Sequence, residues 1–166
     1  MKYSYYKLLL KCICSNKGFT LIELLVVTII IGILAAISIP NLISNIGKAR
    51  ETEATTNLGA LSRSQQAYHF ETQEFASSLS SLDQNISIVS KYYNFPDPSI
   101  ADANLVKQQA IVVSPWSNAS RNYAFGIYQD LGYFDFIFCR AKGVFATVEA
   151  PNIPSDPCTN NGVKVK

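Results

Sequence analysis

The sequence predicts an α+β protein in which one long N-terminal helix packs on a small antiparallel β-sheet. Three observations support this prediction. An apolar segment lies near the N-terminus, an amphipathic segment follows it directly, and short alternating or β-branched runs occupy the last third of the chain. The chain has 166 residues, enough for one anchor segment and one domain with a single modest core.

The apolar segment covers residues 19–39, and Glu23 is its single charged residue. Its length of about 21 residues is enough to cross a bilayer, which needs roughly 20 apolar residues. An ionised carboxylate inside such a segment costs about 2.5–3.5 kcal/mol on insertion scales. Glu23 therefore needs a positive partner. Cleavage after Gly18 would create one, because it exposes the amine of Phe19 close to Glu23 in the sequence.

The ten residues from Gly18 to Val27, with the sequence GFTLIELLVV, resemble the class III signal of type IV pilins and of their relatives, the pseudopilins. The resemblance implies that a membrane-embedded prepilin peptidase cuts after Gly18 and N-methylates Phe19. It also implies that Glu23 acts in filament assembly and that Pro40 matches the family's helix-kinking proline. The fold that it implies is the type IV pilin fold.

Three later stretches, at residues 48–54, 65–68 and 75–76, are similar to the pilin-like G/H group that is common in cyanobacteria. The paired cysteines near the C-terminus fit the same group. For residues 77–121 no resemblance is identified.

Charge is distributed unevenly between the first 18 residues and the rest. The full chain has a net charge of +2. The first 18 residues contain four lysines and no acid, so without them ten Lys and Arg remain against twelve Asp and Glu, a net charge of about −2. By the positive-inside rule the N-terminus is cytoplasmic and the globular part lies outside the inner membrane. The lysines are Lys2, Lys7, Lys11 and Lys17.

Two simpler interpretations of the N-terminus are a cleaved secretory signal and a plain signal anchor. A secretory signal has an apolar core of about 7–15 residues, shorter than this segment. A plain anchor fits the length, but it does not explain Glu23.

The helix is expected to continue beyond the apolar segment, over residues 40–75, as its amphipathic half. A single apolar stripe runs along it, with Gln65 and Thr72 as interruptions. Gly32 and Pro40 are expected to be weak points and the site of a kink, because glycine costs about 1 and proline about 3 kcal/mol in a helix interior. The stripe consists of Ala54, Leu58, Leu61, Tyr68 and Phe75.

Residues 76–166 are expected to form the globular region. Residues 77–82 suggest a turn or short helix, and residues 129–132 a hairpin turn. Within residues 133–138, Phe134, Phe136 and Phe138 should share one face, opposite Asp135. The tail from Pro151 onward is expected to be held mainly by Cys158. The expected strands cover residues 110–113, 122–128, 133–138 and 144–148.

The four cysteines divide into two pairs. Cys12 and Cys14 lie in the leader and should be lost with it. Cys139 and Cys158 lie in the exported part, where disulfides persist, and would close a loop of about 20 residues worth roughly 3 kcal/mol. Two free buried thiols remain the alternative.

Residue patterns for catalysis or metal binding are missing from the sequence. His69 is the one histidine, and without a Cys or acidic cluster it favours a surface or packing role. There is no glycine-rich phosphate loop, zinc pattern or nucleophile elbow, so we expect no enzyme activity, no metal and no cofactor. Direct DNA binding is unsupported, because the basic residues are scattered along a slightly acidic mature chain.

The sequence therefore predicts a structural subunit of a type IV pilus-like filament. The expected leader is 1–18, and 19–39 serves first as membrane anchor and then as filament core. Expected partners are other copies of itself or other pilins, the prepilin peptidase and N-methyltransferase, the inner-membrane assembly machinery, and the lipid bilayer before assembly. Two alternatives remain: a pseudopilin of a type II secretion-like system, and a membrane-anchored periplasmic domain that binds a ligand.

Overall fold

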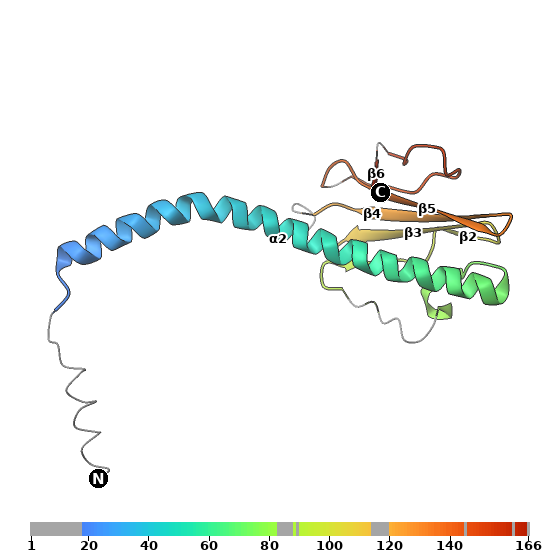
Figure 1. The fold of residues 1–166 in the computed structure, drawn as a ribbon, viewed down its shortest axis with the longest axis horizontal. Helices are drawn as coiled ribbons and strands as arrows, with labels where there is room; N and C mark the ends of the chain where they lie inside the picture. Colours follow the sequence, from blue (N-terminus) through green and yellow to red (C-terminus); the bar gives the residue numbers. More distant parts are fainter. Residues whose placement is uncertain are drawn as a thin grey trace, which may run out of the picture. The chain divides into compact units, whose positions relative to one another are not determined.

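Helix α2 (Leu21–Thr72) begins the described fold, and strands follow it toward the C-terminus (Figure 1). The computed structural model describes residues 18–82, 88, 90–113, 120–144, 146–160 and 162–165. The chain divides into two compact units, Met1–Leu42 and Ile43–Lys166. After α2 come η1 (Leu79–Ser81), β1 (Tyr93–Asn94), β2 (Ile100–Ala101), β3 (Leu105–Val112), β4 (Tyr123–Asp130), β5 (Tyr133–Arg140) and β6 (Val163–Val165).

The strands form an antiparallel sheet in the order β1-β3-β4-β5-β6, and β2 also pairs with β3. The β4–β5 hairpin is paired over its full length, from Tyr123 opposite Arg140 to Asp130 opposite Tyr133. Its loop is the residue pair Leu131 and Gly132, both at positive φ (47° and 86°), as a tight two-residue hairpin requires. The predicted turn at residues 129–132 and the helical turn near residue 80 are both confirmed.

The second part of α2 covers one face of this sheet. Ala54, Leu58 and Leu61 are buried in one cluster with apolar residues of β3 and β4 such as Val106 and Phe125. Apolar side chains repeating at three and four residues explain this, since they fall on one face of a helix.

Gln65 belongs to the buried stripe. The prediction that it interrupts the stripe is wrong. Its side chain is fully buried. The amide nitrogen donates to the Ala76 carbonyl (3.0 Å), and the amide oxygen accepts from the Ala76 N–H (2.9 Å). A buried amide is stable when both its ends are bonded, so Gln65 fastens the chain that leaves α2. Phe75 is buried as expected, but it lies beyond the helix, which ends at Thr72.

The C-terminal region lies on the other face of the sheet. Val148 and Cys158 are buried with Ala124 and Cys139 of the hairpin. A Cβ on Gly126 would come within 2.9 Å of the Ala150 Cβ, so glycine at this position allows the two segments to approach closely.

Two predictions about the C-terminal region are wrong. Residues 144 and 146–148 form no strand, and β6, which no pattern indicated, pairs with β5 instead. The tail is therefore held by more than Cys158. The strands predicted at residues 110–113, 122–128 and 133–138 exist as β3, β4 and β5, with β3 beginning earlier and the other two ending later. Phe134 and Phe138 pack against the helix-side core, and Phe136 stacks on the core residue Phe125, so the predicted shared face is confirmed.

Candidate functional site: the start of the helix and the surfaces of the globular unit

The helix start is organised by Thr20 and Glu23. The Thr20 hydroxyl donates to Glu23 Oε2 (3.1 Å) and also accepts from the Glu23 N–H (3.3 Å). The Thr20 N–H makes a longer contact with the same carboxylate oxygen (3.4 Å). This reciprocal pattern is a capping box, which satisfies backbone donors that a helix start leaves unpaired. Glu23 also places negative charge in the first turn, which the helix dipole favours.

The capping box was missed at the sequence level, although the spacing Thr-x-x-Glu indicates it. It gives Glu23 a local role beside the predicted assembly role. The Phe19 amine does not exist in the uncut chain, so its pairing with Glu23 stays a prediction. Gly18 and Phe19 precede the helix and are exposed, as a cleavage site must be. The rest of the predicted leader, with Cys12 and Cys14, lies outside the described residues.

The first part of α2 carries an apolar surface that its own unit leaves uncovered. Its most apolar stretch has a mean hydropathy of 2.8 and no buried residue. Among the described residues, α2 is the helix that is long and apolar enough to cross a membrane. Helix α2 also continues through Gly32 and Pro40, so the predicted kink stays a prediction. A surface of this kind needs lipid or other helices around it.

Cys139 of β5 and Cys158 of the C-terminal segment form a disulfide. Both residues are buried, at 0% and 4% exposure. Around them, the Tyr128 hydroxyl donates to the Pro151 carbonyl (2.6 Å), and Thr159 makes hydrogen bonds with Glu149. The disulfide thus joins the last strand of the hairpin to a loop that polar contacts also hold.

Replacing both cysteines by alanine is expected to lower the free energy of unfolding by about 3 kcal/mol, because the disulfide restricts the unfolded chain. The tail should then be cut by protease while the N-terminal helix keeps its membrane association. Denaturant unfolding and limited proteolysis measure the two effects. Non-reducing peptide mapping of the natural protein should recover the two cysteine peptides joined, and recovery of both as free thiols would refute the pairing.

His69 has a packing role. It is 5% exposed, its Nε2 lies 2.8 Å from the Ala103 carbonyl oxygen, and the centre of its ring lies 4.5 Å from that of the Phe75 ring, at a tilt of 43°. Among the described residues, no group of three or more His, Cys, Asp or Glu side chains could hold a metal ion.

A polar link between α2 and β4 was not predicted. The Glu51 carboxylate accepts hydrogen bonds from the Tyr123 hydroxyl (2.9 Å) and from the Arg121 N–H (3.2 Å). Burial raises the pKa of Tyr123 above its ordinary value of 10.0, and the hydrogen bond to Glu51 raises this pKa further. Burial likewise raises the pKa of Tyr128 to about 12. The sequence shows Glu51 only as a charge on a polar face, because its partners lie some 70 residues away.

These phenols predict a loss of stability in alkali. Their folded pKa lies above the unfolded one, so the folded state holds its protons more tightly and stability falls as pH rises above about 10. We expect the free energy of unfolding to be constant just below that pH and to decline above it. Tyr123→Phe should flatten the decline. An identical pH dependence in the variant would show that Tyr123 does not contribute.

Comparison with known proteins gives two family matches. Residues 51–159 match the family described as type IV pilin-like G and H. Residues 13–39 match the prokaryotic N-terminal methylation motif, the segment that contains Gly18, Phe19 and Glu23.

Individual relatives fall into two groups. The type IV major pilin protein PilA of Myxococcus xanthus is 49% identical over 61 residues, which cover 37% of this chain and 28% of that pilin. The type II secretion system core protein G of Aeromonas hydrophila is 33% identical over 62% of this chain and 69% of its own length. The type II secretion system core protein G of Vibrio cholerae is 30% identical over 78% of this chain and 83% of its own length.

Proposed function

Because the chain belongs to the type IV pilin-like G and H family, we propose that it is a structural subunit of a type IV pilus-like filament. The observation that carries this proposal is the uncovered apolar part of α2, which begins directly after a processing motif and contains one carboxylate. Such a surface suits two successive environments without bulk water: the bilayer before assembly and the packed helices of a filament afterwards.

The proposed sequence of events begins with the uncut chain in the inner membrane, its N-terminus cytoplasmic and its globular unit periplasmic. The prepilin peptidase cleaves after Gly18, and Phe19 becomes the methylated first residue. Glu23 of an assembled subunit then attracts the Phe19 amine of an incoming subunit and sets its position along the fibre. In low dielectric that attraction is strong, although desolvation of both charges offsets much of it. The inner-membrane assembly machinery supplies the force, and the chain itself carries out no catalysis.

A second candidate is a pseudopilin of a type II secretion-like system. It is favoured by the extent of the matches, since the core protein G sequences align over 62% and 78% of this chain and the Myxococcus pilin over 37%. Both candidates share the processing and polymerisation steps. They differ in the length of the fibre and in what its loss impairs.

Immunogold labelling of surface filaments tests the proposal. An antibody against the globular unit should label long fibres along their length, and deletion of the gene should remove these fibres. A deletion strain that keeps its fibres but no longer secretes proteins would instead support the pseudopilin. Protein that stays in the membrane fraction under every condition would contradict both and favour an anchored ligand-binding domain.

A further inference from the structure

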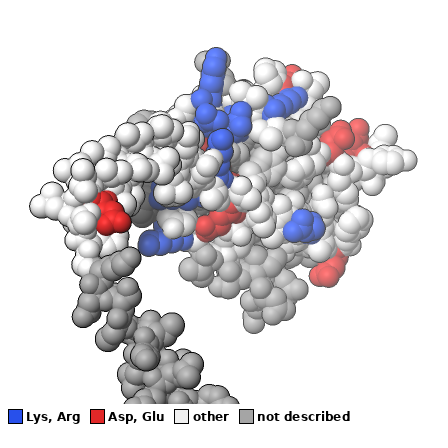
Figure 2. Space-filling model, turned by 60° about the vertical axis from the view of Figure 1, so that its left-hand side comes forward, with Lys and Arg blue, Asp and Glu red and all other residues white. Residues whose placement is uncertain are grey.

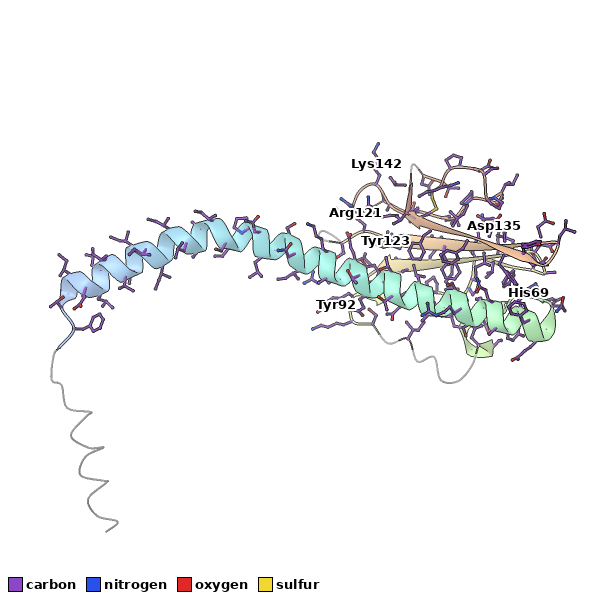
Figure 3. The ribbon with its side chains drawn as sticks, viewed as in Figure 1. His69, Tyr92, Arg121, Tyr123, Asp135 and Lys142 are labelled. Carbon is purple, nitrogen blue, oxygen red and sulfur yellow. A yellow bond between two sulfur atoms is a disulfide. The ribbon has the colours of Figure 1, made fainter. Side chains whose placement is uncertain are left out.

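The two ends of the β4–β5 hairpin carry opposite charges. Figure 3 shows Arg121 and Lys142 at one end of the sheet and Asp135 toward the other. The hairpin strands are eight residues long, so these ends are roughly 23 Å apart at 3.3 Å per residue. That distance prevents the two ends from neutralising one another within one globular unit.

The positive end contains a hollow of about 380 Å³ between α2 and the open end of the hairpin. Lys48 of α2 lines it together with Arg121 and with Arg140 of β5, and Gly47 and Val144 give it an apolar part. Figure 2 shows Lys and Arg side chains on the face of the globular unit that is turned forward, with Asp and Glu side chains beside them. The hollow therefore offers three cations beside a small apolar surface.

The described residues that line this hollow include three cations and one carboxylate. Among the described residues that line it, Glu51 is the acidic one, and its two carboxylate oxygens accept bonds from the Arg121 N–H and the Tyr123 hydroxyl. The Nε of Arg140 is buried and has no hydrogen-bond partner among the described residues.

The negative end is the tip of the hairpin, formed by residues 130–135. Asp130 and Asp135 line a second hollow there, and none of the described residues that line it is basic. Leu131 and Tyr133 project from the tip and are 89% and 81% exposed. The tip is thus an exposed apolar protrusion with a carboxylate on either side.

Leu131 is unusual in both its backbone conformation and its exposure. It takes a positive φ of 47°, at a turn position where Asn, Asp or Gly is strongly preferred, and its large apolar side chain is almost fully in water. Choices that break local rules without a local gain are expected at functional sites. Burial of Leu131 against another molecule would provide that gain.

We propose that the hairpin tip of one copy of this chain inserts into the basic hollow of another copy. Leu131 would contact the apolar part at Gly47 and Val144, while Asp130 and Asp135 would face Lys48, Arg121 and Arg140. Both surfaces belong to every copy and differ from each other, so the contact is head-to-tail and produces an open polymer rather than a closed dimer. It rests on the proposed filament function and adds a contact between globular units to the packing of helices.

Charge reversal tests this contact. Lys48 and Asp135 are both exposed, so Lys48→Glu and Asp135→Lys leave the core intact. Each variant alone places like charges together in every contact of the polymer, and like-charge contacts cost several kcal/mol. We expect the ratio of sheared-filament protein to membrane protein to fall about tenfold or more for each. The double variant exchanges the charges in one chain and should restore the ratio to within about twofold of wild type.

Crosslinking identifies the same contact directly. Leu131→Cys combined with Val144→Cys should give a ladder of covalent multimers when filaments are treated with a short bis-maleimide. Cys139 and Cys158 are already bonded to each other and do not react. The matched control pairs Leu131→Cys with Asn94→Cys, an exposed position on β1 outside the hollow, and should give no ladder.

Three results would overturn the inference. Normal filament yield in both single reversals would contradict the proposed contact, and so would equal ladders in the test and control pairs. Neither result would contradict the proposed filament function. Loss of Lys48→Glu from the membrane fraction, with Asp135→Lys unaffected, would assign the hollow to lipid phosphate instead. Absence of wild-type filaments would instead count against the proposed function, and is thus distinguished from failure of this contact.

Discussion

Gly18→Val is expected to leave the whole protein in the membrane with residues 1–18 still attached. The proposed peptidase is expected to need a small residue before the cut. A Cβ at Gly18 meets nothing within 4 Å among the described residues, so we expect the substitution to leave the packing of the described residues unchanged. Without cleavage there is no amine at Phe19, and we expect no detectable filaments. The measurement is the intact mass of the membrane-bound chain together with the yield of sheared filaments.

Gly18→Ala is the matched control, because alanine is the smallest change that adds a side chain. It should be cut more slowly than the natural protein but still yield processed chain. Complete processing of Gly18→Val would show that cleavage does not depend on Gly18.

Glu23→Gln should insert in the membrane at least as well as the natural protein and yet enter filaments poorly. The amide removes the cost of a buried charge and still suits a capping box, in which Gln serves as well as Glu. What it loses is the attraction for the Phe19 amine of an incoming subunit. Without wild-type subunits present, we expect the ratio of filament to membrane protein to fall at least about tenfold, equivalent to 1.4 kcal/mol per contact.

Thr20→Ala separates the charge of Glu23 from its capping role. This variant removes the hydroxyl that bonds Glu23 but keeps the carboxylate. It should cost about 1 kcal/mol of helix stability at the N-terminus and still assemble. Equal filament loss in Thr20→Ala and Glu23→Gln would mean that capping, not charge, limits assembly. Unaltered filament yield in Glu23→Gln would remove the main physical support for the assembly mechanism.

The helix and the central strands could be predicted because their patterns are local. The spacing of Ala54, Leu58 and Leu61 gives the buried face of α2 directly, and the alternation after Tyr133 gives β5 its two faces. The turn between β4 and β5 follows from Gly132, since a two-residue hairpin needs positive φ.

The errors arise where the deciding partner is distant in the sequence. Gln65 has a polar side chain in an apolar stripe, and only the Ala76 backbone explains its burial. Residues 144–148 are rich in β-branched side chains, but Ala146 and Val148 pack on the face of the sheet, and the Asn122 side chain donates to the Ala146 carbonyl. Position in the fold, rather than β-propensity, decides such segments.

The functional residues differ in the same way. Gly18, Phe19 and Glu23 lie within one continuous motif, so the sequence alone is enough to propose roles for them. The basic hollow joins Lys48 to Arg121 and Arg140, which are about 70 to 90 residues further along the chain and carry no shared pattern. Such a surface becomes visible only when the fold brings α2 and the β4–β5 hairpin together.

The intact mass of the chain released from sheared surface filaments tests the central claim most directly. We expect a chain that begins at Phe19, carries one added methyl group and retains the bond between Cys139 and Cys158. Filaments whose subunit still begins at Met1 would contradict the proposed processing. Filaments that lack this chain altogether, from cells that hold it in their membranes, would contradict its role as a filament subunit.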